Sequence, residues 1–287
     1  MDEQIAKMFA TAYKEYIKEL SQSEEPSFKY LSYDFSFLEK ESWRGLGYQL
    51  VENELRETTN IINNWLNNLM RWNAWNNVID EYDDLEKAWS IRNEFLEALV
   101  HHCLLQPSAI RDTIVFISTN SFHQVRITCE ENYKDYLEGD PKGPNEKPIY
   151  FSRKKKEGRL MKLISHWGGA SRFLTSLRLI NCKEYQAQTY DYRNRASHAI
   201  APRLELGVTQ FVIRSVIQAE EMKKQEDGKY MPIPIEGKMA VRYSFGGIQP
   251  LELRVAYKEN LKQYVLTRKC YMEYKGLLEE RVKFIKD

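Results

Sequence analysis

The sequence lacks the features that mark membrane, secreted and metal-scaffold proteins. No stretch approaches the run of about 20 apolar residues that a membrane-spanning helix needs. The N-terminal residues are acidic and lead into an amphipathic helix, so no secretory signal is predicted. The four cysteines are scattered without a close pair, at positions 103, 129, 182 and 270. We therefore expect a cytoplasmic protein with reduced, mostly buried thiols and no membrane partner.

An excess of charge of either sign is also missing. The chain carries 42 Lys and Arg against 41 Asp and Glu, which leaves a formal net charge of +1. Proteins that bind nucleic acid without regard to its sequence are usually far more basic. Positive charge is nevertheless concentrated in Arg153-Lys154-Lys155-Lys156, which is either a solvated helix start or a binding patch. Arg153 and Lys154 are therefore candidates for substrate binding.

Familiar metal, nucleotide and redox motifs are absent from the sequence. There is no H-E-x-x-H, no pair of C-x-x-C motifs, no Walker loop and no glycine-rich dinucleotide turn. The run His101-His102-Cys103 does not predict a metal site, because consecutive helical residues point in different directions. We expect neither a metal nor a cofactor.

Apolar residues at helical spacing dominate the 287 residues and predict a mainly α protein. An extended stretch is predicted over 28–37, and 139–148, with its glycines and prolines, is predicted to be a surface loop. Alternating apolar residues predict a small β-hairpin at about 230–245 that turns at Glu236-Gly237. Helices are predicted over 2–20, 47–79, 84–105 (ended by Pro107), 107–128, 153–180 (kinked at Gly168-Gly169) and 208–224, and from Pro250 onwards.

The most informative segment is Arg193-Asn194-Arg195-Ala196-Ser197-His198. Arginine can hold a phosphate with its planar set of donors, and histidine can transfer a proton near neutral pH. These two groups suffice to break a ribose phosphodiester, because RNA supplies its own nucleophile, the 2′-OH. Within this segment and beside it, Arg195 and Tyr192 are candidates for substrate binding.

This segment resembles the signature of the HEPN superfamily, helical domains found in many prokaryotic toxin and antiviral ribonucleases. That signature is an arginine, usually followed by a polar residue, with a histidine four to six intervening positions on. Here four residues separate Arg193 from His198, and Asn194 takes the polar position. The resemblance covers only these few residues. It implies that Arg193, Asn194 and His198 are catalytic and that no metal is needed.

The resemblance also implies an architecture. We predict a HEPN-like helical bundle with additional helices and the small hairpin. Residues 150–287 would form the core that carries the motif, and 1–140 would pack on the bundle or form part of it. In the family, the motifs of two protomers meet at a dimer interface. Helix geometry agrees with a dimer. On a helix, Arg193 and His198 are about 7.5 Å apart along the axis and roughly 140° apart around it, which is poor for one compact site. A second copy across a twofold axis brings two Arg/His sets together.

The function predicted from these residues is a metal-independent endoribonuclease that cleaves RNA by 2′-OH attack, as a toxin or antiviral defence effector. Its partners would be RNA, a second copy of the chain and an antitoxin or regulatory protein. The alternative is a non-catalytic helical module that binds RNA, nucleotide or a protein. In a purely structural interpretation, Arg193 pairs with a carboxylate such as Asp191, and His198 caps or packs a helix end.

Two further features have competing interpretations. Arg159 and His166 form a second, looser match to the signature, but Leu160 takes its polar position. Their helix presents a buried apolar face, so a helix surface is the better interpretation. One interpretation of Trp65, Trp72 and Trp75 is that they stack on RNA bases, yet aromatics at helical spacing more often belong to a core or an interface.

Overall fold

The computed structural model describes residues 3–22, 30–39 and 42–285. The chain forms two compact units: one comprises the residues up to Arg193 together with those from Leu253 onward, and the other comprises Asn194–Glu252. In these described ranges, no helix combines the length and the apolar character needed to cross a bilayer.

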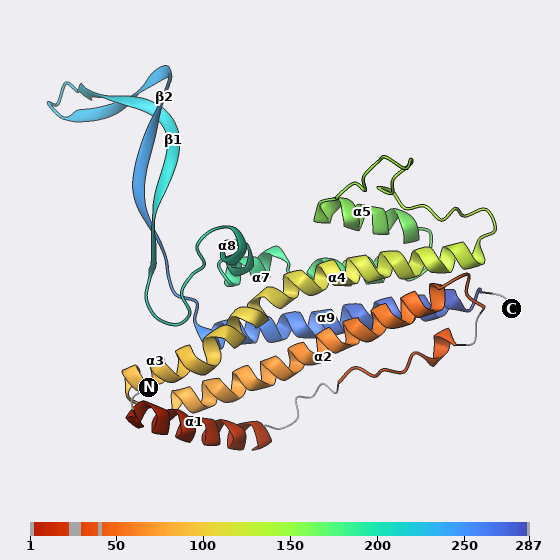
Figure 1. Ribbon diagram of the computed structural model, residues 1–287. Helices are drawn as coiled ribbons and strands as arrows, with labels where there is room; N and C mark the ends of the chain where they lie inside the picture. Colours follow the sequence, from red (N-terminus) through yellow and green to blue (C-terminus); the bar gives the residue numbers. More distant parts are fainter. Residues whose placement is uncertain (1–2, 23–29, 40–41, 286–287) are drawn as a thin grey trace. The chain divides into compact units, whose positions relative to one another are not determined.

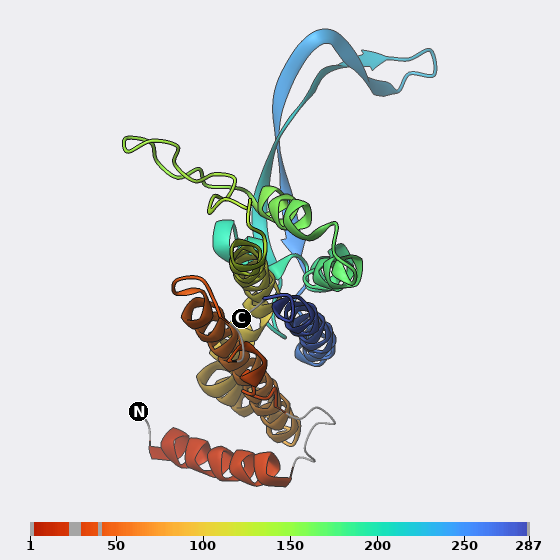
Figure 2. The same cartoon turned by 90° about the vertical axis from the view of Figure 1, so that its right-hand side faces the viewer.

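Three long helices, α2 (Gly47–Asp80), α4 (Glu97–Cys129) and α9 (Leu253–Val282), form the centre of the first unit. They pack against one another lengthwise, as both ribbon views show (Figures 1 and 2). The core between them is aromatic, and its largest fully buried side chains are Trp65, Trp72, Phe122, Phe173, Tyr264, Tyr271 and Tyr274. Trp65 and Trp72 therefore belong to the core, and Trp75 is also buried.

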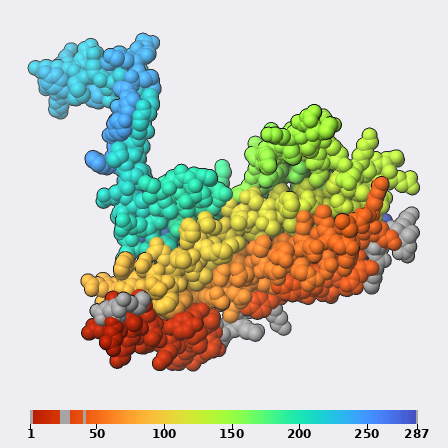
Figure 3. Space-filling model, viewed as in Figure 1, coloured from red at the N-terminus to blue at the C-terminus, as the bar shows by residue number. Residues whose placement is uncertain are grey.

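The first helix, α1 (Glu3–Gln22), packs along α2, and the space-filling view shows α4 beside α2 (Figure 3). The contact is a three-ring stack in which Trp75 lies between two aromatic neighbours. The Tyr16 and Trp75 ring centroids are 4.4 Å apart, and those of Trp75 and Phe95 are 4.6 Å apart. Such stacking adds to the gain from burying the rings, so α1 is joined firmly to the unit.

Of the segment predicted to be extended, the described residues 30–37 lie along α2 without forming a strand. Its first two residues, Phe28 and Lys29, fall outside the described ranges, and the rest ends in the 3-10 helix η1 (Ser36–Leu38). The Asn63 side chain accepts from the Leu31 amide at 2.8 Å and donates to the Leu31 carbonyl at 3.1 Å. Tyr33 donates to Asn60 at 2.7 Å. Asn60 and Asn63 of α2 thus bind a chain segment, and these hydrogen bonds offset their low helix propensity.

Pro107 does not end a helix, contrary to the sequence prediction. It lies inside α4, which follows α3 (Leu85–Ile91) and the π-helical turn η2 (Arg92–Leu96). An interior proline removes the amide that would bond the carbonyl four residues earlier, here that of Cys103. The side chain of Asn260, from α9, donates to this carbonyl at 2.9 Å instead. The helix continues because a distant residue replaces the lost bond.

The chain between α4 and α9 adds α5 (Arg153–Ile164), α6 (Ala170–Leu179) and α7 (Lys183–Gln188) to the first unit. Helix α5 packs on α4, and α6 packs on α9. The predicted kink at Gly168-Gly169 is a full break, with Gly169 in the left-handed region at a φ of 83°. Arg111 of α4 holds α5 through Glu157, with 2.8 Å between Nε and Oε1.

The second unit contains the β-hairpin, and two sequence predictions about it were wrong. Residues 208–224 were expected to form a helix, but Thr209–Lys224 is strand β1. It pairs antiparallel with β2 (Tyr230–Ile248), so the turn lies between the two strands at Gln225–Lys229 and not at Glu236-Gly237. The register shifts between Gln218 and Glu220, where 235–238 form a bulge. A bulge bends its strand, and the hairpin bends part-way along its length (Figure 1).

The protein is therefore mainly α with a small two-stranded hairpin, as predicted. Helices α2 and α4 come from the region 1–140 and α9 comes from the region 150–287, and all three lie in the same unit. This unit is the setting for the start of the motif.

Candidate functional site

The motif lies on the short helix α8 (Tyr192–His198), which follows α7 (Lys183–Gln188) after a tight turn. Two residues of the turn, Tyr190 and Asp191, have positive φ angles of 50° and 53°. Non-glycine residues in this region are strained and persist only where their surroundings hold them. The holding contacts are local: the Asp191 amide donates to the Gln186 carbonyl at 2.6 Å, and the Tyr192 amide donates to the Thr189 carbonyl at 2.9 Å.

Tyr192 anchors the first turn of α8. Its side chain is buried, and its hydroxyl lies 3.0 Å from His101 Nδ1 of α4, with the two rings edge to face. Burial raises the pKa of Tyr192 to about 12, with a smaller contribution from Glu97. The hydroxyl therefore stays protonated at neutral pH. This residue was a candidate for substrate binding, and the structure places it in packing contact with α4.

The remaining motif residues point less into the protein. Asn194 and His198 are exposed, and Arg193 and Arg195 are half-buried. The Ala199 amide donates to the Arg195 carbonyl at 2.8 Å, so the helical hydrogen bonding extends to the end of the motif. An exposed imidazole on an anchored helix can exchange protons with a bound molecule, and a nearby guanidinium can bind phosphate oxygens.

In the basic segment at the start of α5, Arg153 is paired with residues of α4, and Lys154 is exposed to solvent. Arg153 Nε and Nη2 contact the two Asp112 carboxylate oxygens at 2.7 and 2.6 Å, and Nη2 also donates to Ser108 Oγ at 2.8 Å. The hydrogen bond to Asp112 raises the pKa of Arg153. The guanidinium therefore joins α5 to α4, whereas Lys154 is exposed.

The second match to the signature is not assembled as a site. Arg159 Nη1 donates to the Glu138 carbonyl at 2.9 Å, and its guanidinium lies over the Phe151 ring. His166 is exposed and lies edge-on to Trp167, beyond the end of α5. Leu160, Leu163 and Ile164 are buried between them, as a packed helix face requires.

The histidines of α4 have separate neighbours. His101 contacts Tyr192, and His102 Nε2 lies 2.9 Å from Gln106 Nε2. Across the residues that the structure describes, no group of three or more His, Cys, Asp or Glu side chains is arranged to hold a metal ion.

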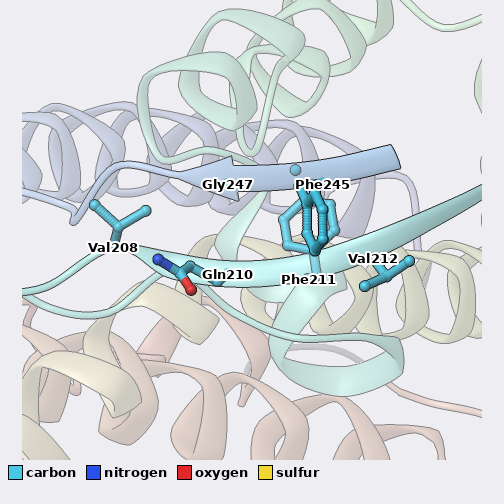
Figure 4. A pocket seen from close by; sticks show the side chains of 7 residues that line it. Val208, Gln210, Phe211, Val212, Phe245 and Gly247 are labelled. Carbon is cyan, nitrogen blue, oxygen red and sulfur yellow. The ribbon is translucent and has the colours of Figure 1, made fainter. Parts of the chain in front are cut away.

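A hollow of about 550 Å³ lies at the base of the hairpin (Figure 4). Val208, Phe211, Val212 and Phe245 line it, together with the backbone of Gly246 and Gly247. Its lining comes from the hairpin and does not include the motif.

The sequence did not reveal that Tyr192 positions α8 through a contact with His101. His101 is 91 residues from Tyr192, so no local pattern could pair them. Tyr185 of α7 is also buried, and its hydroxyl accepts from Asn260 Nδ2 at 2.9 Å. The sequence signal for this packing was the pair of tyrosines, Tyr185 and Tyr192, on either side of the turn between α7 and α8. Comparison with known proteins adds no identification, since no family model, no curated protein and no solved structure matches the chain.

Proposed function

We propose that this protein is a metal-independent endoribonuclease of the HEPN type. The observation that carries the proposal is the placement of Arg193, Asn194 and His198 on one short helix with the histidine exposed. The contact of the buried Tyr192 side chain with His101 supports it, because a catalytic histidine must be held in a defined place.

The reaction divides between the three side chains as follows. A neutral His198 imidazole takes the proton from the ribose 2′-OH, and the 2′-oxygen attacks the adjacent phosphorus. The bond from phosphorus to the 5′-oxygen breaks, and this oxygen takes a proton from an imidazolium. Arg193 stabilises the charge that gathers on the phosphate oxygens, and Asn194 orients the phosphate or the imidazole.

The proposed active form is a homodimer with α8 at the twofold axis. Arg193 and His198 are separated by about 7.5 Å along the helix and by about 140° around it. A second copy across the axis adds another arginine and histidine, so that one imidazole can act as base and the other as acid. A toxin or antiviral effector role in the cytoplasm, with an antitoxin or regulatory partner, belongs to the same proposal.

RNA cleavage in excess EDTA tests the mechanism. The expected products carry 2′,3′-cyclic phosphate and 5′-hydroxyl ends, which enzymatic end-labelling and mass spectrometry distinguish from 3′-hydroxyl and 5′-phosphate ends. Strict dependence on added Mg²⁺ or Mn²⁺ would contradict the proposal. The near-neutral charge of the chain favours one competing function, a non-catalytic binding module. Binding of RNA without cleavage under every condition would support that function instead.

A further inference from the structure

One face of the β-hairpin is apolar and open to solvent over its whole length between the base and the bulge. Residues paired across an antiparallel ladder share a face, and successive residues alternate between faces. Val212 pairs with Phe245, Arg214 with Tyr243, Val216 with Val241, and Gln218 with Met239. We name these eight residues the apolar face; each of them is exposed.

The opposite face is covered to a greater extent. Phe211, Ser215, Ile217 and Ser244 are half-buried, whereas Ile213, at 42%, Ala240 and Arg242 are exposed. On the apolar face, by contrast, Tyr243 is 66% and Phe245 is 96% exposed. A two-stranded ribbon is marginally stable in water by itself. Large aromatic side chains so fully exposed on such a ribbon indicate a binding surface.

The composition of this part of the hairpin is that of an interface centre. The stretches 209–218 and 239–248 contain no Lys, Asp or Glu, and every Lys, Asp and Glu of the hairpin lies in the bulge, in the turn or between the two. Interface cores are depleted in Lys, Asp and Glu and enriched in Tyr, Phe, Met and Arg. Solvent-exposed ribbons usually carry lysines to prevent association, and here that protection is missing.

We propose that the apolar face binds the same face of a second copy of this chain across a twofold axis. Two ribbons packed face to face form a four-stranded, two-layered arm with a buried centre. The area is adequate. Two aromatic and four aliphatic side chains at these exposures present roughly 700 Å² per copy, and a standard interface removes about 800 Å² from each partner.

Self-association fits the charge of the face better than a charged partner does. Arg214 is its only charged residue, so the face offers little that a strongly acidic or basic surface could complement. An isologous contact needs only that the face is compatible with itself. Arg214 lies across from Tyr243 in the ladder, and arginine packs well on tyrosine rings at interfaces. The proposal is independent of RNA cleavage, which can fail while this contact stands.

The test compares substitutions on the two faces of the full-length chain. Tyr243→Thr with Phe245→Thr removes the aromatic rings of the apolar face. The matched control, Ile213→Thr with Ala240→Thr, places two threonines on the opposite face of the same strands. Sedimentation across a dilution series measures the dissociation constant of the dimer, and hydrogen exchange of residues 209–218 and 239–248 checks that the hairpin forms. All six tryptophans lie outside Asn194–Glu252, so their fluorescence reports the helical unit separately.

The expected result is a wild-type dimer of twice the 34.1 kDa chain mass through the apolar face; where the α8 contact of the proposed ribonuclease also forms, it adds larger species. The apolar-face variant should weaken this dimer by about 100-fold, and the control should leave its dissociation constant within about 3-fold of wild type. A wild-type monomer at about 100 µM overturns the proposal, because protein interfaces of this area range from µM to pM affinity. Equal weakening by both variants, or no weakening by either, overturns it as well.

Discussion

The side-chain amide of Asn260 donates a 2.9 Å hydrogen bond to the backbone carbonyl of Cys103, the carbonyl that Pro107 leaves without a helical donor. Asn260 is completely buried, and its Oδ1 also accepts from Trp65 Nε1 at 2.9 Å. One asparagine of α9 therefore satisfies polar groups on α2 and α4. Unsatisfied buried groups are costly, so this residue permits a proline in the middle of the bundle.

Replacing Asn260 by leucine should destabilise the protein strongly. The change leaves the Cys103 carbonyl, the Trp65 indole and the Tyr185 hydroxyl without the partner that they share. We expect a loss of about 2–4 kcal/mol in the free energy of unfolding, measured by urea denaturation with tryptophan fluorescence.

Pro107→Ala supplies the matched control for Asn260→Leu. The alanine amide can donate to the Cys103 carbonyl within the helix, so the double variant should regain about 1 kcal/mol relative to Asn260→Leu alone. Strict additivity of the two substitutions would show that they do not act on the same carbonyl.

Glu54 should make stability fall as the pH rises from about 5 to 7. This α2 residue accepts from Asn120 at 2.6 Å through Oε1, and its Oε2 is buried without a hydrogen-bond partner among the described residues. Burial raises the pKa of Glu54 to about 7, and the bond from Asn120 offsets only part of this. The folded state thus binds a proton more tightly than the unfolded state. The stability that protonated Glu54 contributes is complete below the unfolded pKa near 4.5 and is lost as the pH rises through the folded pKa of about 7.

Glu54→Gln should remove this dependence and raise the free energy of unfolding at pH 8 by about 1–2 kcal/mol, a value reduced for partial solvent access. Denaturation curves at pH 5, 6, 7 and 8 provide the measurement. Glu57→Gln is the control, because Glu57 is exposed on the same helix. Parallel pH profiles for wild type and Glu54→Gln would contradict the prediction.

His198→Ala should abolish RNA cleavage and leave the fold intact. The side chain is exposed at the end of α8, so the free energy of unfolding should change by less than about 0.5 kcal/mol. Loss of an acid–base group should lower the cleavage rate by at least about 100-fold. Cleavage assays and thermal melts of the same preparation measure the two effects.

His166→Ala is the matched control for His198→Ala, since His166 is also exposed and belongs to the competing Arg159/His166 match. It should retain full cleavage. Full activity in His198→Ala, or equal loss in both variants, would rule out the catalytic role of His198.

Tyr192→Phe should separate anchoring from catalysis. Phenylalanine keeps the buried ring and removes only the hydroxyl contact with His101, so the free energy of unfolding should fall by about 1 kcal/mol. Cleavage should fall less than about 10-fold, in contrast to His198→Ala, because the ring still holds the helix. The exposed neighbour Tyr190→Phe should change neither quantity. A stable Tyr192→Phe protein without activity would instead support the hypothesis that Tyr192 binds the substrate.

The spacing of apolar residues was sufficient to locate α1, α2 and α9, because helical periodicity is a local property of the chain. The break near Gly168-Gly169 and the loop over 139–148 were visible for the same reason: glycine and proline act on their own backbone. The motif on α8 was also visible as six adjacent residues. Whether it is catalytic remains a prediction.

Contacts between residues distant in the sequence decided the features that the local pattern did not: strand β1, the continuation of α4 through Pro107 and the position of α8. Val208, Phe211, Val212, Val216 and Ile217 fit a helix by their spacing, but a strand gains its hydrogen bonds from a partner, and Tyr230–Ile248 supplies one. Pro107 would end an isolated helix, and Asn260, more than 150 residues later, lets it continue. The position of α8 likewise depends on His101 and Tyr192. In each case the local pattern permitted two outcomes, and a hydrogen-bond partner brought near only by folding selected one.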